Sequence, residues 1–185
     1  LEIQGTDRLG VQLYFDETSY HTMFEALEDV IRAKNNRLAE LRDTLLGTLP
    51  VHQRELYPVR FPWLNSTQEE AVNKVLCTKD VAIVHGPPGT GKTTVINGII
   101  KTYADLHGLD LKKSDLPIIL AAPTGRAARR MNELTKLPSA TIHRHLGLNG
   151  EDDFKTLDDY LDCDLIIIDE FSMVDTWLAN QLFES

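Results

Sequence analysis

The chain has 185 residues, of which 42% are apolar and 25% charged, with a net charge of −9, and this balance excludes a disordered protein. It holds no apolar run of the roughly 18 residues that a membrane helix requires, and its two cysteines are too far apart to indicate a disulfide framework or a zinc site. We therefore expect a globular domain in the reducing cytoplasm and, because the first residue is Leu1, a piece of a longer protein.

The first part of the chain predicts a short strand and then a long helix. Apolar and polar residues alternate over residues 11–15, and apolar residues recur at spacings of three, four and seven over residues 20–46, the pattern of an amphipathic helix. A break at Asn35-Asn36 is an alternative to one continuous helix. We expect residues 1–60 to form a helical arm or stalk. The apolar positions of the helix are Phe24, Leu27, Ile31, Leu38, Leu41 and Leu45.

From residue 61 onward, helices alternate with apolar, β-rich strands. Strands of this kind, separated by helices, indicate a parallel sheet covered by helices on both faces. The fold class that we predict is therefore α/β, with one domain over residues 61–185. The predicted helices are 66–77, 92–106, 125–135, 141–147 and one after Asp175, and the predicted strands are 81–85, 118–122 and 165–169.

The strongest functional signal is Gly86-Pro87-Pro88-Gly89-Thr90-Gly91-Lys92-Thr93, which matches the phosphate-binding pattern G-x-x-x-x-G-K-[ST]. It lies between a predicted strand and a predicted helix. Backbone N–H groups of such a loop surround phosphates, and the helix N-terminus adds positive potential. We expect these residues and Thr94 to bind ATP, Lys92 to act on the β- and γ-phosphates as a catalytic residue, and Thr93 to ligate Mg²⁺. The alternative is a glycine-rich turn that binds nothing.

A second signal is the pair of carboxylates Asp169 and Glu170, directly after the apolar run Leu165–Ile168. Ligands bind at the carboxyl ends of the strands in open parallel sheets. We therefore expect Asp169 to hold Mg²⁺ and Glu170, as a catalytic residue, to orient and polarise the attacking water. The alternative is that the two acids merely end a strand.

Gln68 has two interpretations. It closes the run Asn65-Ser66-Thr67-Gln68 at the start of a predicted helix, shortly before the phosphate-binding loop. Its amide can accept from N6 and donate to N7 of adenine, so Gln68 is a candidate for recognition of the nucleotide base. A solvated glutamine in the first turn of a helix capped by Ser66 or Asn65 is equally consistent with the sequence.

The negative net charge conceals a basic segment. Residues 151–175 contain ten acidic residues and one basic residue, whereas residues 121–146 contain five basic residues and one acidic residue. Within the basic segment, Pro123-Thr124-Gly125-Arg126 joins a predicted strand to a predicted helix, where N–H groups and a hydroxyl are suited to phosphates. We expect these four residues and His143 to contact a nucleic-acid backbone. The alternative is a solvated arginine face that pairs with the acidic segment.

Taken in order, these motifs resemble those of superfamily 1 DNA helicases. From about Thr93 onward the chain is similar to the RecD-type branch, the exodeoxyribonuclease V α-subunit. The resemblance implies a RecA-like P-loop NTPase fold in which ATP and Mg²⁺ serve as cofactors and single-stranded DNA is gripped by the Pro-Thr-Gly motif. The residues that carry it are Gln68, the loop at 86–93, Pro123-Thr124-Gly125, Thr141-Ile142-His143-Arg144 and Asp169-Glu170.

The front part resembles another branch. Residues from about 10 to 91, including Phe61-Pro62-Trp63, are more similar to Upf-like superfamily 1 helicases, in which long helices precede the motor core. RecD-type loops usually carry Gly-Gly-Pro where this chain has Gly86-Pro87-Pro88. We hypothesise a composite chain joined near Thr93-Thr94, and an intermediate natural lineage is the alternative.

These observations predict the first motor domain of an ATP-dependent helicase that moves along single-stranded DNA, with RNA not excluded. The 5′-to-3′ polarity and accessory recombination or repair subunits are implied by the resemblance alone. Because the chain stops at Ser185, before a second RecA-like domain, we expect this piece to unwind nothing by itself. The competing hypotheses are a nucleotide-dependent switch or clamp on nucleic acid, and a chain whose loop is never occupied.

Overall fold

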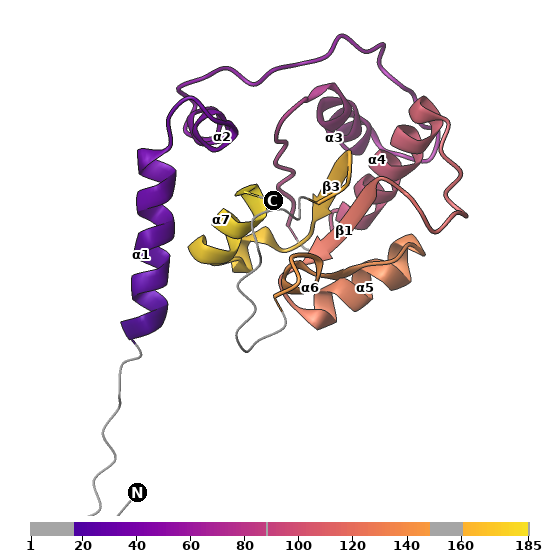
Figure 1. The fold of residues 1–185 in the computed structure, drawn as a ribbon. Coiled ribbons are helices and arrows are strands. Elements are labelled where there is room, and N and C mark those ends of the chain that lie inside the picture. Colours follow the sequence, from indigo (N-terminus) through magenta and orange to yellow (C-terminus); the bar gives the residue numbers. More distant parts are fainter. Residues whose placement is uncertain (1–16, 88, 149–160, 185) are drawn as a thin grey trace, which may run out of the picture.

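The computed structural model describes residues 17–87, 89–148 and 161–184 (Figure 1). The strand predicted over residues 11–15 lies outside them. No helix in these ranges combines the length and the apolar character needed to cross a bilayer. The helices are α1 (Glu17–Arg32), α2 (Arg37–Leu45), α3 (Ser66–Cys77), α4 (Lys92–His107), α5 (Gly125–Thr135), α6 (Ile142–His145) and α7 (Thr176–Glu184), with a 3₁₀ turn at Phe171–Met173.

Three strands form one sheet in the order β2-β1-β3, namely β1 (Ile118–Ala122), β2 (Ala140–Thr141) and β3 (Leu165–Ile168). Both pairings are parallel. Because the strands run in one direction, their carboxyl ends reach the same edge of the sheet. The predicted α/β class with a parallel sheet is confirmed.

Alternate residues of the central strand enter two apolar clusters. Ile118 and Leu120 pack with Ile100 of α4 and Met131 of α5, whereas Ala121 packs with buried residues of α6 and α7. Neighbouring residues of a strand point to opposite faces. Helices therefore cover both faces of the sheet, as the sequence predicts.

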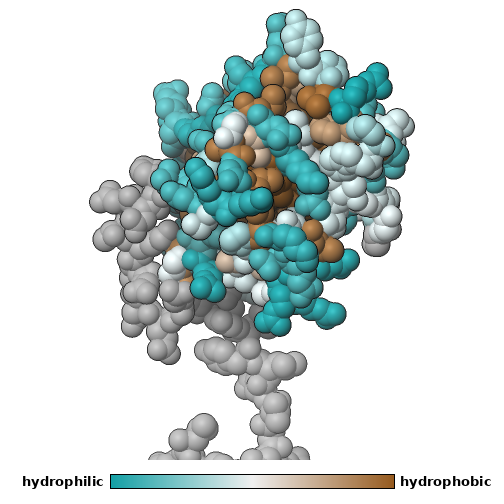
Figure 2. Space-filling view, turned by 90° about the vertical axis from the view of Figure 1, so that its right-hand side faces the viewer, coloured by the Kyte–Doolittle hydropathy of each residue, from teal (hydrophilic) through white to brown (hydrophobic). Residues whose placement is uncertain are grey.

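The segment after α4 extends the first of these clusters. Leu109, Leu111 and Leu116 pack against it and are only partly buried. Figure 2 views the molecule from the side on which this segment lies, and shows apolar side chains gathered in the middle of a mostly hydrophilic surface. The core of the domain thus reaches the surface on this side.

Helices α3 and α4 pack closely together. Val72 of α3 is completely buried and clusters with Val95 and Ile99 of α4. Gly98 permits the approach, because a Cβ atom at this position would lie 2.9 Å from Cγ2 of Val72. The start of α4 is therefore held against α3 by a dense apolar contact.

The strand predicted over residues 81–85 is wrong, because this segment joins none of the described strands. Val81 is half-buried, but Ile83 is 81% exposed and Val84 is 40% exposed. A β-rich composition does not by itself supply the partner that backbone N–H and C=O groups require. As a result β3 is an edge strand of the described sheet, and all four of its residues are only partly buried.

The continuous helix predicted over residues 20–46 is also wrong, and the break lies at the alternative position, Asn35-Asn36. Asn35 has a φ of 57°, and the Asn36 side chain caps α2 by accepting from the N–H of Ala39 at 3.0 Å. Arg42 of α2 donates to three carbonyl groups at the end of α1. These side chains replace the backbone bonds that a helix loses at its ends.

The apolar stripe of α1 is not its buried face. Phe24 is 65% exposed and Ile31 is 63% exposed, whereas Ala26 is 4% exposed. Helix α1 contacts α7, beside which it stands in Figure 1. The small side chain of Ala26 is thus more deeply buried than the large ones of the stripe.

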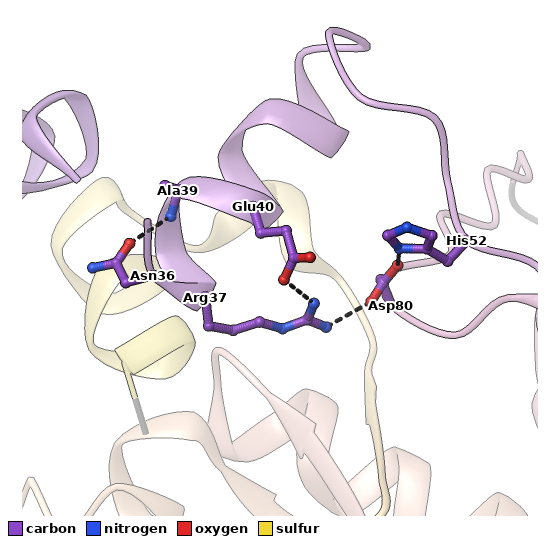
Figure 3. Close-up of polar contacts among 6 residues, drawn as sticks. All are labelled: Asn36, Arg37, Ala39, Glu40, His52 and Asp80. Carbon is purple, nitrogen blue, oxygen red and sulfur yellow. Dashed lines mark hydrogen bonds and ion pairs between the residues drawn. The ribbon is translucent and has the colours of Figure 1, made fainter. Parts of the chain in front are cut away.

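A polar cluster joins α2 to the segment that precedes the phosphate-binding loop (Figure 3). The side chain of Asp80, which is 8% exposed, accepts from Nη2 of Arg37 at 2.7 Å. Its second oxygen lies 3.1 Å from Nδ1 of His52. Arg37 also donates to Glu40 of its own helix at 2.9 Å. Residues 37 and 52 are thereby attached to the domain at a single carboxylate.

Replacing Asp80 with asparagine is expected to remove an acid-dependent part of the stability. The hydrogen bond from Arg37 holds the pKa of Asp80 below its ordinary value, and His52 acts in the same direction. A lowered pKa stabilises the fold above the pKa of the unfolded chain, and the contribution is lost as the pH falls through the folded pKa. We expect Asp80→Asn to lower Tm by about 3 °C at pH 7, and by progressively less between about pH 5 and pH 2.

Thermal melting followed by circular dichroism across this pH range checks the prediction. The matched control is Glu70→Gln, because Glu70 pairs with Lys74 at 2.7 Å but both side chains are exposed, by 63% and 76%. Exposed pairs contribute little to stability, so the control should melt like the parent. Equal losses in the two variants at every pH would contradict the role assigned to Asp80.

Candidate nucleotide and nucleic-acid sites

The predicted phosphate-binding loop leads directly into α4. Gly89 and Gly91 have φ values of 86° and 81°, in the left-handed region that favours glycine. Gly91 is the N-cap of α4, and no side chain in the described part of the chain caps that helix. The N–H groups at the start of α4 therefore remain available to an anion. Pro88 lies outside the described residues.

The turn before α4 is held by Thr90. Both the N–H and the hydroxyl of Thr90 donate to the carbonyl of Pro87, at 3.3 and 2.8 Å. Gly86 lies so close that a Cβ atom there would be 2.7 Å from Oγ1 of Thr90. Beyond the turn, Lys92 is exposed, whereas Thr93 and Thr94 are half-buried in the first turn of the helix.

The two predicted carboxylates stand at the end of β3. The N–H of Asp169 donates to the carbonyl of Ala121 at 3.1 Å and extends the pairing of β3 with β1. One carboxylate oxygen of Asp169 accepts from the N–H of Glu170 at 2.9 Å. Glu170 is exposed and has a φ of 57°, a conformation that costs a residue other than glycine about 1–3 kcal/mol. Backbone strain thus coincides with a residue that the sequence singles out for catalysis.

One cavity is lined by one residue from each half of the predicted nucleotide site. It has a volume of about 530 Å³, lies between α4 and β3, and is lined by both Lys92 and Asp169. Thr93 and Glu170 are the chain neighbours of these two residues, but they are not among those that line the cavity. Lys92 and Asp169 therefore face a common space, although the sequence places them far apart; residues 86–91 of the loop are not among those that line it.

Gln68 contacts the phosphate-binding loop, and the sequence did not predict this contact. Its Oε1 accepts from the N–H of Asn65 at 3.2 Å, and Asn65 accepts in return from the N–H of Gln68 at 2.9 Å. This reciprocal pair is a capping box, which the spacing Asn65-x-x-Gln68 could have revealed. The Nε2 of Gln68 donates to the carbonyl of Thr90 at 3.2 Å, a long-range contact for which the sequence gives no signal.

The predicted nucleic-acid residues stand at the same edge of the sheet as Asp169. Ala121 pairs with Ile168, and Ala122 pairs with Thr141, so Pro123 and Asp169 each follow neighbouring strands, which lie about 4.8 Å apart. Thr124 caps α5, its hydroxyl oxygen accepting from the N–H of Ala127 at 3.2 Å. A hydroxyl that accepts this bond keeps its own hydrogen for another acceptor.

The arginines of α5 form an exposed basic face. None of them makes an ion pair within the described residues. The alternative, in which they pair with the acidic residues 151–164, concerns mainly residues 151–160, which lie outside the described ranges; the described acids Asp162 and Asp164 make no ion pair with them. The exposed arginines are Arg126, Arg129 and Arg130 of α5 and, on α6, Arg144.

The two histidines of α6 differ in their surroundings. Nε2 of His145 lies 3.1 Å from the carbonyl of Leu120, so this ring is bound to the central strand. His143 is half-buried in a helix that Thr141 caps by accepting from the N–H of Arg144 at 3.2 Å. Across residues 17–87, 89–148 and 161–184, no three His, Cys, Asp or Glu side chains could hold a metal ion together.

Comparison with known proteins assigns the chain to a family. The family model described as "AAA domain" (AAA_19) matches residues 68–185. The match therefore begins at Gln68 and includes the phosphate-binding loop, the basic segment and the two carboxylates. It covers more than half of the chain, so the chain belongs to this family.

Named relatives include two RecD-type proteins and a DNA-binding protein. The chain is 32% identical over 144 residues to RecBCD enzyme subunit RecD of Buchnera aphidicola, with 68% of this chain and 23% of the relative covered. It is 34% identical over 152 residues to ATP-dependent RecD2 DNA helicase of Deinococcus radiodurans (80% and 20% covered). It is also 33% identical over 132 residues to DNA-binding protein SMUBP-2 of Rattus norvegicus (70% and 13% covered).

ATP-dependent helicase upf1 of Schizosaccharomyces pombe is also a relative, 30% identical over 158 residues with 81% of this chain and 17% of the relative covered. The RecD and Upf1 matches together confirm the mixed resemblance that the sequence indicates. Each match covers more than two thirds of the chain. Because residues 86–93 lie near the middle of the chain, each match must extend to both sides of this loop. A junction near Thr93-Thr94 stays a prediction. The chain spans less than a quarter of the length of these relatives. The family model and these relatives together show that the chain is a member of the AAA_19 family and belongs with the superfamily 1 helicases.

Proposed function

We propose that the chain is the ATP-binding motor domain of a helicase that uses ATP to move 5′ to 3′ along single-stranded DNA. The observation that carries the proposal is the cavity lined by both Lys92 and Asp169. An uncapped helix N-terminus and a carboxylate offer opposite charges to the two parts of a metal–nucleotide complex, the phosphates and the cation. The name of the relative from Deinococcus, ATP-dependent RecD2 DNA helicase, supports the same activity.

The residues present fit ATP and Mg²⁺. A carboxylate and a hydroxyl are ligands that Mg²⁺ accepts, and it usually completes its shell with substrate phosphates and water. Asp169 and Thr93 would supply these two ligands. Bound Mg²⁺ supplies neutralisation of charge on the phosphate oxygens. The N–H groups of Gly89 and Gly91 and the ammonium group of Lys92 would hold the phosphates.

Glu170 is the candidate for activation of water. Its side chain is exposed directly beyond the strand that ends at Asp169. A carboxylate in this place would orient the attacking water and accept its proton, whereas the N–H bond from Glu170 holds the Asp169 carboxylate in place. The two acids thereby have separate tasks.

The proposed binding site for single-stranded DNA consists of Pro123, Thr124, Gly125, Arg126 and His143. The first four follow β1, and β1 is paired with β3, which carries Asp169. A displacement of Asp169 would thus be transmitted through the paired strands β3 and β1 to the residues proposed to bind DNA. RNA binding, accessory subunits of recombination or repair, a cytoplasmic location and the domain division at residue 60 stay predictions.

Removing one arginine of the basic face is expected to weaken DNA binding in a salt-dependent manner. Each phosphate contact on a single strand contributes about −0.7 to the slope of log K against log salt. We expect Arg126→Ala to make this slope shallower by about that amount. Fluorescence anisotropy with a labelled oligonucleotide at several salt concentrations measures it. Lys74→Ala, an exposed lysine on α3 paired with Glu70, is the control with the same charge change and should leave the slope unchanged.

The test of the proposed function is ATP turnover in the full-length protein with and without single-stranded DNA. Stimulation by the oligonucleotide is expected of a motor, and nucleotide binding without stimulation would favour a switch or clamp. On the present chain, Mg-ADP at 100 times its Kd should add about 2.7 kcal/mol to the free energy of unfolding. A chain that melts at the same temperature with and without Mg-ADP would contradict the proposal.

A further inference from the structure

Gln68 and the phosphate-binding loop are joined by a contact that a role in base recognition does not require. The Nε2 of Gln68 donates to the carbonyl of Thr90 at 3.2 Å, and a Cβ atom on Gly91 would collide with the same Nε2. The side chain therefore lies directly against the backbone of the loop at the residue before Lys92.

The orientation of the Gln68 amide is fixed at both ends. Its oxygen faces an N–H donor, that of Asn65, and its nitrogen faces an acceptor, the carbonyl of Thr90. Turning the amide over would put oxygen against oxygen and N–H against N–H, so only one orientation satisfies both partners. The amide thus links the start of α3 to the loop.

Helix α3, which carries Gln68, is capped at its start and packed against α4. Helix α3 begins with the reciprocal capping box between Asn65 and Gln68, and it is held to α4 by the buried cluster of Val72, Val95 and Ile99. Gln68 therefore connects a fixed base to the loop. Thr90, whose carbonyl accepts from Gln68, also donates twice to the carbonyl of Pro87. Thr90 is therefore bonded both to α3 and to the start of the turn.

Fixing the Thr90 carbonyl also fixes the N–H of Gly91. The two groups belong to one planar trans peptide and point in opposite directions, so an N–H of Gly91 points away from Gln68. This N–H finds no acceptor within the described residues. It stands at the uncapped N-terminus of α4, where a phosphate oxygen would be bound.

We propose that Gln68 is a positioning residue for the phosphate-binding loop, which sets the direction of the Gly91 N–H by holding the carbonyl of Thr90. The proposal rests on the proposed function, since it assigns the loop to phosphates. The positioning role and the base-recognition role predict different effects on ligand binding. A residue that positions the loop affects every ligand with the same phosphates, whereas a residue that reads adenine affects only adenine nucleotides.

The experiment compares the binding of ATP, GTP and inorganic tripolyphosphate, each with Mg²⁺, by calorimetry. The variant is Gln68→Met, which keeps the length of the side chain but can neither donate to Thr90 nor accept from Asn65. The lost hydrogen bond is expected to weaken all three ligands by the same factor, about fivefold. Tripolyphosphate, which has no base, is the decisive ligand.

The matched control is Asn65→Ala. It removes the side-chain cap of α3 but leaves the bond from Gln68 to Thr90 in place, so all three affinities should stay close to those of the parent. A second variant, Gln68→Glu, keeps the acceptor for the N–H of Asn65 and replaces only the donor to Thr90, and it should bind tripolyphosphate at least as weakly as Gln68→Met. Circular dichroism establishes that each variant is folded.

Two results would overturn the proposal. One is a loss of ATP affinity in Gln68→Met with tripolyphosphate unchanged, which would assign Gln68 to the base. The other is an equal loss of tripolyphosphate affinity in Asn65→Ala, which would assign the effect to the helix cap. The parent is measured first, and a parent that binds none of the three ligands would overturn the proposed function itself.

Discussion

Replacing Lys92 with alanine is expected to produce the largest loss of ATP turnover. Lys92 is exposed at the start of α4 and lines the cavity that Asp169 also lines. Removing one group that stabilises charge developing in the transition state costs about 10²–10³ in turnover. We expect Lys92→Ala to lose turnover by this factor and ATP affinity by about tenfold or more.

The measurements are a phosphate-release assay on the full-length protein and calorimetry with Mg-ATP on both forms. Lys101→Ala is the matched control, because Lys101 lies on the same helix with its Nζ 5.2 Å from the ring centre of Trp63 and does not line the cavity. The control should bind and turn over ATP like the parent. If Lys92→Ala held ATP as tightly as the parent, the nucleotide site would have to lie elsewhere.

Replacing Glu170 with glutamine is expected to separate binding from hydrolysis. The amide keeps the size of the side chain but cannot accept a proton from water. Loss of a general base costs about 10²–10⁴ in turnover. ATP affinity should change little, because the groups assigned to the phosphates and to Mg²⁺ are on other residues. Asp169 should also keep its bond from the backbone N–H of residue 170, since that bond involves no Glu170 side-chain atom.

Single-turnover hydrolysis and calorimetry on the same protein measure the two effects independently. Glu133→Gln, an exposed acid of α5, is the control with the same chemical change and should leave both unchanged. A Glu170→Gln variant with parental turnover would remove Glu170 from the mechanism. A variant that lost ATP affinity to the same degree as turnover would instead assign Glu170 to binding.

The accurate parts of the sequence interpretation depend on near neighbours. Helices α3 and α5 have the predicted bounds, and each begins after a residue whose side chain caps it, Asn65 or Thr124. Asp175 likewise accepts from the N–H of Leu178 at the start of α7, at 2.8 Å. Capping bonds and helical periodicity join residues within one turn, so the sequence displays both partners together.

The errors concern hydrogen-bond partners that the local pattern of residues does not reveal. The segment over residues 81–85 has the composition of a strand but pairs with no described strand. The apolar spacing over residues 20–46 also suits a helix, yet the side chains of Asn36 and Arg42 satisfy the backbone on both sides of a break. In the first case no partner strand is found among the described residues, and in the second case side chains take the place of the backbone partners that a continuous helix would supply.

The sequence by itself predicted the candidate phosphate-binding loop, the helix that follows it, strands β1 and β3 and the pair of acids after β3, because each is encoded in a short run of residues; it did not indicate β2. Only the tertiary structure decided that Lys92 and Asp169 line one cavity, and that Gln68 holds the carbonyl of Thr90. The physical reason is that these contacts depend on how α3, α4 and the sheet pack together. Packing is set by many weak apolar contacts at once, which no short segment contains.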